Sequence, residues 1–343
     1  MKHLLSIAAM MSVLLITRTA VAQDFDDPSL YLSFISKNQR EVSVKYLSYM
    51  SAASHGRSMR KVEKRRADLI NAIYETRVRI YGMPTFKGDK QLRDSAVSYL
   101  KILYSVFNED YSKIVNMEEI AEQSYDNMEA YLLAQEKVSE RLSEAHAAYA
   151  RAQKTFAANN NITLLDDESE LGRKLETIDK LTSYYNEVFL TFFKVYKQEV
   201  YLVDAVSAKN TNAIEQNRNA LLKYAEEGLD KISKMKGFNN DRTLESVCRQ
   251  LIRFYKDEAE KSIPKISDFF LKVENFKKLQ QSFESSEKTK ELVNNYNKAV
   301  DDMNRSSMAF NNTNDQLNNK RSEMLSSYND TVKSFMDTYM PYK

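Results

Sequence analysis

The chain has 343 residues, and its 50 basic and 48 acidic side chains leave a formal net charge of only +2. Such a balance provides no overall field that attracts nucleic acid or an anionic membrane, so either partner would need a local patch. A single cysteine, Cys248, excludes an intrachain disulfide, and stability must therefore come from packing.

The first 22 residues have the pattern of a signal peptide. Lys2 and His3 form a basic start, the apolar run "LLSIAAMMSVLLI" follows, and "AVA" at 20–22 fits the site that signal peptidases cleave. The apolar run is shorter than the ~20 residues that a membrane-spanning helix needs. We therefore expect cleavage before Gln23 and an exported protein of the periplasm or cell surface, with no transmembrane anchor.

The mature chain is predicted to be all-α. Its six glycines and four prolines permit few turns, apolar residues recur at steps of three and four, and the two-residue alternation of strands is absent. Pro264 fits the first turn of a helix, and "SFESSEKT" at 282–289 is a place where the last helix can kink or break. The expected helices are 30–56, 58–82, 90–112, 115–158, 168–208, 211–236, 242–262 and 264–340.

Two long apolar seams predict coiled-coil-like helices and an elongated shape. One seam runs from Met117 to Phe156 and the other from Val293 to Phe335, each advancing by 3.5 residues on average, which keeps one face toward a partner helix. Polar residues interrupt both seams. We expect them to fix the register of packing, with ligand contact as the alternative. They are Ser124, Gln135, Ser307, Asn314 and Arg321.

A repeated stretch predicts an internal duplication. "MPTFKGDKQL" at 83–92 and "MKGFNNDRTL" at 235–244 lie 152 residues apart, and twelve of 48 positions are identical when 45–92 is aligned with 197–244. The sequence therefore predicts two tandem four-helix units, 23–160 and 161–343. In each corner an aspartate is expected to cap the next helix, while a phenylalanine and a leucine on either side of it pack together. These residues are Phe86, Asp89 and Leu92, and Phe238, Asp241 and Leu244.

Motifs for catalysis or cofactor binding are missing from the sequence. It contains no HExxH, CxxC, GxSxG, Walker or GxGxxG motif. The two histidines of the mature chain, His55 and His146, have no helical partner at the spacing of a metal site. We therefore predict no metal, no cofactor and no catalytic residue, and a protein that is not an enzyme.

The strongest local charge is the stretch "RSMRKVEKRR" at 57–66. It can contact an anionic envelope component such as lipid, with nucleic acid disfavoured by the neutral overall charge; the other interpretation is a solvated basic turn. The second copy, "KNTNAIEQNR" at 209–218, lacks most of this charge, so the fold does not require it. The patch consists of Arg57, Arg60, Lys61, Lys64, Arg65 and Arg66.

Several strings are similar to those of a known family: "DPSLYLSFI", "VEKRRADLINAIYETRVRI", "YKQEVYLVDA", "NALLKYAEEGL" and "FMDTYMPY". Together they resemble a family of exported bacterial surface proteins of unknown function, found in Bacteroidetes-like and spirochaete genomes. The resemblance extends over essentially the whole mature chain. It implies a bacterial envelope setting and no activity, because the family has no established site residues to carry over.

The sequence thus favours an exported helical protein that acts by contact with an envelope protein or an anionic envelope component. Its seams can also support a homo-oligomer. The alternative is a bundle that binds a small ligand between helices, near the aromatic stretch 184–201. A pore-forming protein is disfavoured because the mature chain has no long apolar stretch.

Overall fold

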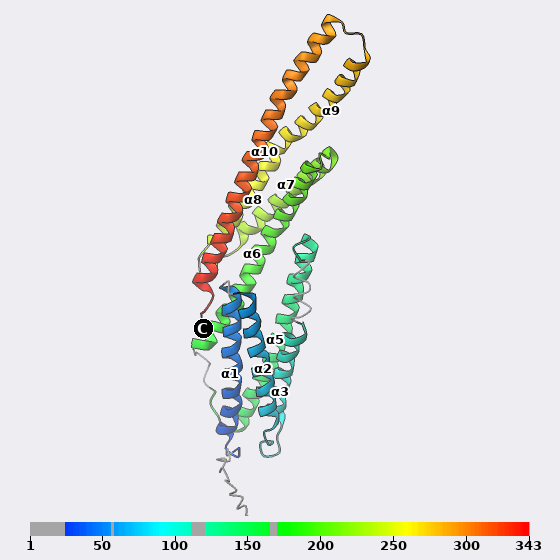
Figure 1. Ribbon diagram of the computed structural model, residues 1–343. Helices are drawn as coiled ribbons and strands as arrows, with labels where there is room; N and C mark the ends of the chain where they lie inside the picture. Colours follow the sequence, from blue (N-terminus) through cyan, green and yellow to red (C-terminus); the bar gives the residue numbers. More distant parts are fainter. Residues whose placement is uncertain (1–24, 56–57, 111–120, 165–169, 343) are drawn as a thin grey trace, which may run out of the picture.

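The computed structural model describes residues 25–55, 58–110, 121–164 and 170–342. All regular secondary structure within these ranges is helical, which confirms the predicted all-α class. Figure 1 shows an elongated molecule in which the first helices form the lower half, the later helices form the upper half, and a helical hairpin projects from the far end.

The first half contains four described helices and one short π-helical turn. They are α1 (Pro28–Ser54), α2 (Met59–Tyr81), α3 (Gln91–Ser105), the π-helical turn η1 (Val106–Asp110) and α5 (Tyr125–Asn159). Asp27 caps α1 by accepting a hydrogen bond from the Leu30 amide at 2.8 Å, and Pro28 occupies the first turn, where its missing N–H costs nothing.

The second half has the same order of elements. It contains α6 (Glu170–Ser207), α7 (Thr211–Lys234), α8 (Thr243–Asp257), the π-helical turn η2 (Glu258–Ser262), α9 (Ile263–Ser285) and α10 (Lys290–Tyr339). The side chains of Asn210 and Thr289 cap α7 and α10 by accepting backbone N–H groups of the first turn.

One of the predicted helices was wrong in extent, and the break predicted in another is present. The helix expected at 115–158 begins at Tyr125, because the hydroxyl of Ser124 accepts the Asn127 amide and caps it; Ser124 is therefore a cap and not a seam residue. Met117, where the seam was expected to start, lies outside the described residues. The break expected within 282–289 is confirmed, because the chain reverses at 286–289 and the stretch 264–340 forms two helices, α9 and α10, which make the projecting hairpin.

The two corners have the same geometry. Phe86 and Asp89 exchange backbone hydrogen bonds in an isolated bridge, and Phe238 and Asp241 form the equivalent bridge. Each aspartate accepts the backbone amide two residues further on at 2.7 Å. Leu92 and Leu244 are buried in the same hydrophobic clusters as their respective phenylalanines.

The π-helical turns also recur at the spacing of 152 residues, because Val106 and Glu258 begin them. A wide π turn interrupts the regular ladder of helical hydrogen bonds. In each half an arginine from the neighbouring helix donates to a carbonyl of this turn: Arg66 to Phe107 at 3.0 Å and Arg218 to Ala259 at 3.1 Å. These arginines therefore stabilise the backbone.

The equivalence of α1 and α6 follows a different spacing, 153 residues. Ala52 and Ala205 are both buried, and α1 and α6 end at Ser54 and Ser207, because the loop after α1 is one residue longer. At a spacing of 152, buried Tyr49 would correspond to Tyr201, which is exposed. The sequence identities within α1, including that pair, therefore do not mark equivalent positions.

The last helices of the two halves, α5 and α10, correspond at a spacing of 179 residues. Phe156 of α5 and Phe335 of α10 contact the two corner phenylalanines, with ring centroids 5.0 and 6.2 Å away, and Tyr149 corresponds to buried Tyr328. Because the spacing grows from 152 to 179, the hairpin of the second half is 27 residues longer, which at 1.5 Å per residue extends it by about 20 Å. A common ancestral unit stays a prediction.

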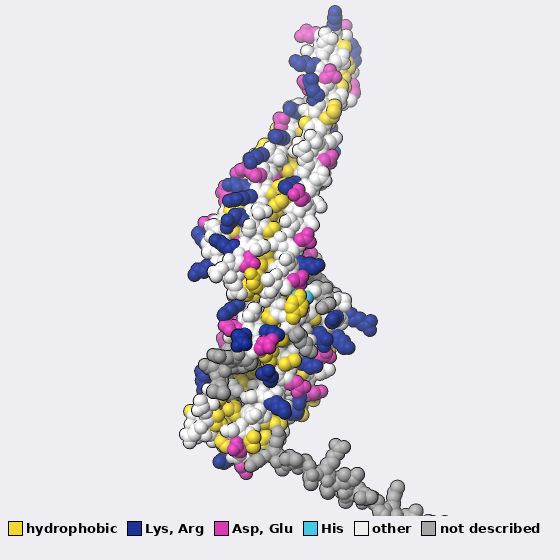
Figure 2. Space-filling view, turned by 90° about the vertical axis from the view of Figure 1, so that its left-hand side faces the viewer, with side chains coloured by type: hydrophobic (Ala, Val, Ile, Leu, Met, Phe, Trp, Pro, Cys, Tyr) yellow, Lys and Arg dark blue, Asp and Glu magenta, His cyan; other side chains and the backbone are white. Residues whose placement is uncertain are grey.

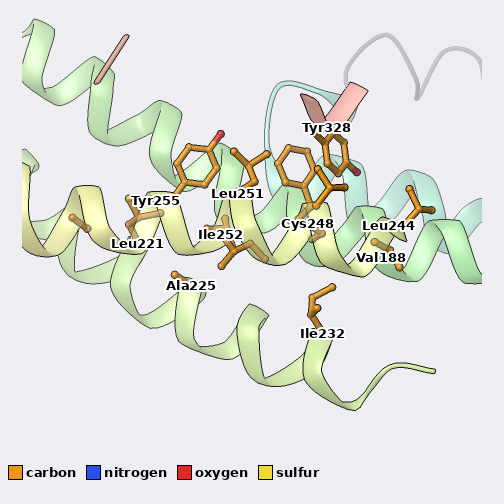
Figure 3. Packing of buried hydrophobic residues seen from close by; sticks show 14 of the residues in the cluster. Val188, Leu221, Ala225, Ile232, Leu244, Cys248, Leu251, Ile252, Tyr255 and Tyr328 are labelled. Carbon is orange, nitrogen blue, oxygen red and sulfur yellow. The ribbon is translucent and has the colours of Figure 1, made fainter. Parts of the chain in front are cut away.

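Each half has its own hydrophobic core. Figure 3 shows part of the second core, where Cys248, Leu251 and Tyr255 of α8 project between α6, α7 and Tyr328 of α10. Burial raises the pKa of Cys248 to about 12, so the thiol is protonated and unreactive at neutral pH. The cysteine behaves as a small apolar side chain.

A third, smaller cluster joins the halves where the start of α5 packs against α6. It contains Tyr125, Met128, Tyr131 and Leu132 from α5 and Phe189, Leu190, Phe193 and Tyr196 from α6. The positions of α1 and α10 that correspond to these residues, by the spacings of 153 and 179 residues, are mostly polar. On α1 they are Ser36, Lys37, Arg40 and Ser43, and on α10 they are Asn304, Ser307, Phe310 and Asn311.

Candidate functional site

The predicted basic patch separates into structural and exposed cations. Arg66 bonds to the carbonyl of the π turn and to Glu63, and Arg65 lies 3.5 Å from Asp68. The three remaining described cations, Arg60, Lys61 and Lys64, are exposed and have no ion pair in the described part of the chain. Arg57 lies outside the described residues.

These three cations stand at the start of α2, where the helix dipole disfavours positive charge. No acidic residue occupies the first turn, and Ser58 makes no capping hydrogen bond with its side chain. Charge of both signs is otherwise interspersed along the face shown in Figure 2. The start of α2 is therefore a local cationic site on a neutral surface.

A buried ion cluster lies in the second half. Arg321 of α10 pairs with both Glu199 of α6 and Glu258, the first residue of η2. Their side chains are 13%, 5% and 0% exposed, respectively. Two buried carboxylates against one guanidinium leave one excess negative charge when both are ionised, which is costly in a medium of low polarity. The cluster therefore links three elements while favouring protonation of one acid.

The pKa values agree with this geometry. Burial, and then the neighbouring Glu258 carboxylate, raise the pKa of Glu199 to about 7 in spite of the attraction of Arg321. Burial also raises the pKa of Glu258. The Asp204 carboxylate of α6 also raises the pKa of Glu199, and, after burial, the charge of Glu199 raises the pKa of Tyr255 of α8.

We expect this cluster to make stability depend on pH. Because the folded-state pKa of Glu199 lies above its unfolded value, the folded state holds the proton more tightly, and stability is greatest below about pH 4.5 and is lost as pH rises through about 7. Between about pH 5.5 and 8, the free energy of unfolding measured with urea should therefore fall by about 2 kcal/mol more in the wild type than in Glu199→Gln. Parallel curves for the two proteins would contradict the assignment.

Sequence reasoning found only one member of this cluster. Arg321 stood out as a polar residue in an apolar seam, and its expected role in fixing register fits its buried pairing. Glu199 and Glu258 lie on helices with many other charged residues. Their only sequence signal is that each falls on the apolar face of its own helix.

The equivalent positions in the first half are uncharged and line a groove. Tyr46 corresponds to Glu199, Val106 to Glu258 and Leu142 to Arg321, by the spacings of 153, 152 and 179 residues. All three line a cavity of about 1850 Å³ between the two halves. The charged side chains of the ion cluster therefore fill this position in the second half, whereas in the first half it is apolar and open.

The walls of the groove come from the end of α1, the start of α2, the turn η1, α5 from Glu129 to Ala147 and α6 from Ile178 to Leu190, with Lys231 of α7 at the edge. Between Met128 and Ala145 no side chain of α5 is buried, although this stretch carries apolar residues of the predicted seam. Leu133, which lines the groove, is 51% exposed. The seam of α5 thus lacks a complete partner along about four turns.

The rim of the groove is acidic. Five of the lining carboxylates have no ion pair within the described residues: Glu129, Glu136, Glu144, Asp179 and Glu187. After burial, the Asp179 carboxylate is the next largest cause that raises the pKa of Tyr46, to about 12, which places this charge close to the floor. The one unpaired cation among the lining residues is Lys231. An occupant of the groove therefore meets apolar walls and excess negative charge.

The aromatic stretch 184–201 contributes little to this groove. Phe192 packs against Tyr328 with tilted rings whose centroids are 4.2 Å apart, Tyr184 donates to Glu245 at 2.6 Å, and Phe193 is buried between the halves. Only Asn186, Glu187 and Leu190 of this stretch line the groove. Most of these aromatic rings pack against other protein side chains, and the groove adjoins the stretch near which a small-ligand pocket was expected.

In the described ranges, no cluster of three or more His, Cys, Asp or Glu side chains could hold a metal ion. None of the helices in those ranges has the length and apolar character needed to cross a bilayer. Comparison of the chain with protein-family models, curated proteins and solved structures finds no match. The candidate sites are therefore the groove and the exposed cations of α2.

Proposed function

We propose that the protein is an exported helical protein of the cell envelope that acts by contact with another macromolecule and not by catalysis. The observation that supports this best is the open apolar groove, because the equivalent position in the second half is closed by the chain itself. Exposed apolar surface that a fold is able to close but leaves open is typical of an interaction site.

The size of the groove favours a macromolecule over a small ligand. Pockets for small molecules have volumes of roughly 300–1,000 Å³ and enclose most of their ligand. The groove has about 1850 Å³ and is walled by helices from both halves. A partner that lies along α5 would cover the half-exposed seam over several turns.

Crosslinking in cells tests this function. We expect a photo-crosslinking side chain in place of Leu133 to give a discrete adduct in the envelope fraction, because this residue is exposed within the groove. Leu271 is a matched control, since it is equally exposed on α9 and does not line the groove. No adduct at position 133, or the same adduct from both positions, would refute contact through the groove.

The exposed cations of α2 support a second contact, with an anionic envelope component. We expect Arg60→Ser/Lys61→Ser/Lys64→Ser to lower the affinity for anionic liposomes on the order of 100-fold at low salt, because each cation near the surface contributes about 1 kcal/mol. The control is Lys277→Ser/Lys278→Ser/Lys298→Ser, which removes the same charge from the projecting hairpin. Equal retention of the two variants would show that the cations of α2 have no special role.

A further inference from the structure

We propose that the groove binds a positively charged amphipathic helix of about four turns, supplied by a partner protein. This inference rests on the proposed contact function and names the class of partner for the same site. The observations that carry it are the dimensions of the groove, the chemistry of its walls and the charge of its rim.

The dimensions of the groove match a helix. Its wall on α5 runs from Glu129 to Ala147, a length of about 27 Å at 1.5 Å per residue. A helix of about sixteen residues, roughly 24 Å long and 12 Å wide with its side chains, has a volume of roughly 2,700 Å³. The 1850 Å³ of the groove accommodates most of such a helix and leaves its outer side in water.

The walls are suited to the apolar face of a helix. Tyr46, Val106 and Leu142 lie where the second half has its ion cluster, and Phe107 and Ile178 are further buried side chains of the lining. These residues come from four different elements. Amphipathic helices bind in such grooves through apolar side chains spaced three or four residues apart.

The rim selects the charge of the polar face. The two pairs formed by Glu63 with Arg66 and by Lys137 with Glu140 are neutral. The unpaired carboxylates remain on α5 and α6, on both long walls, and outnumber the one unpaired cation. Lysine or arginine side chains that flank the apolar face of a bound helix would therefore meet opposite charge along both edges, which favours association and fixes orientation.

Binding of a synthetic peptide tests the proposal. The probe is a fluorescent amphipathic Leu/Lys helix of about sixteen residues. The control peptide is a Leu/Glu helix with the same apolar face. We expect the full mature chain to bind the Leu/Lys peptide in fluorescence anisotropy, to bind it more weakly as salt rises, and not to bind the Leu/Glu peptide.

Substitutions on the rim locate the binding. We expect Glu136→Gln/Glu144→Gln/Asp179→Asn/Glu187→Gln to weaken binding at least tenfold, and Leu133→Ser to weaken it without changing its salt dependence. The matched control is Glu274→Gln/Glu287→Gln/Asp301→Asn/Asp315→Asn, which removes four unpaired acids outside the groove. All substituted side chains lie at the surface or the rim, so unchanged circular dichroism and melting show that folding is retained.

Three results would overturn the proposal: no binding of the Leu/Lys peptide, equal binding by the two four-acid variants, or equal binding of both peptides. If a crosslinked adduct forms at position 133 in cells while the Leu/Lys peptide fails to bind, the contact function stands and the class of partner is wrong. If neither occurs, both are refuted.

Discussion

Arg321→Leu is expected to destabilise the protein by about 3–5 kcal/mol at pH 8, because it leaves the buried carboxylates of Glu199 and Glu258 without their cation. The loss should be smaller at about pH 5, where protonation of the raised-pKa carboxyls removes much of the uncompensated charge. Urea unfolding followed by circular dichroism at both pH values measures the difference.

The first half of the chain supplies the control for this substitution. Leu142 and Val106 occupy the equivalents of Arg321 and Glu258, so an apolar version of the cluster is compatible with the fold. We expect the triple variant Glu199→Met/Glu258→Val/Arg321→Leu to be at least as stable as the wild type, as is common when a buried ion cluster is replaced by packed apolar side chains. A triple variant as unstable as the single one would show that lost packing, and not unpaired charge, causes the effect.

Phe193→Ala is expected to destabilise the junction between the halves by about 3–5 kcal/mol, the usual cost of removing a buried phenylalanine ring. Phe193 is 4% exposed and packs with residues from both α5 and α6. The thermal transition should also broaden or separate into two, because each half keeps its own core.

Arg40 is the natural comparison, since it occupies the position of Phe193 on α1 and is exposed. We expect Arg40→Ala to change the free energy of unfolding by less than about 0.5 kcal/mol. Similar losses for the two variants, or a single sharp transition in Phe193→Ala, would contradict the role of this cluster in joining the halves.

Helix periodicity accounts for most of the fold that could be predicted. Apolar spacing located the helices to within a few residues, because burial of one face dominates their placement. It failed at Ser124, where a cap interrupts a seam whose spacing continues on the other side, whereas the break between α9 and α10 falls within the predicted 282–289. The periodicity shows which face of a helix is apolar, but it does not show whether the helix continues or ends.

The candidate site was less accessible to sequence reasoning. The groove depends on where α5 diverges from α1 and approaches α6, which no local pattern encodes. The charge cluster required pairing of residues more than 60 positions apart, as with Glu258 and Arg321. The basic stretch was visible, but its division into exposed cations and a backbone-supporting Arg66 depended on the π turn.

The outer faces of α1 and α10 are polar at the positions that correspond to the apolar junction between α5 and α6. In repeat proteins each unit packs an apolar surface against the next unit, and the terminal units have a polar outer face. Here Lys37 and Arg40 on α1 and Asn304 and Asn311 on α10 stand where further copies would have to stack. Stacking further copies on these faces would bury charged and amide side chains, so we expect the α1 and α10 faces to disfavour end-to-end assembly.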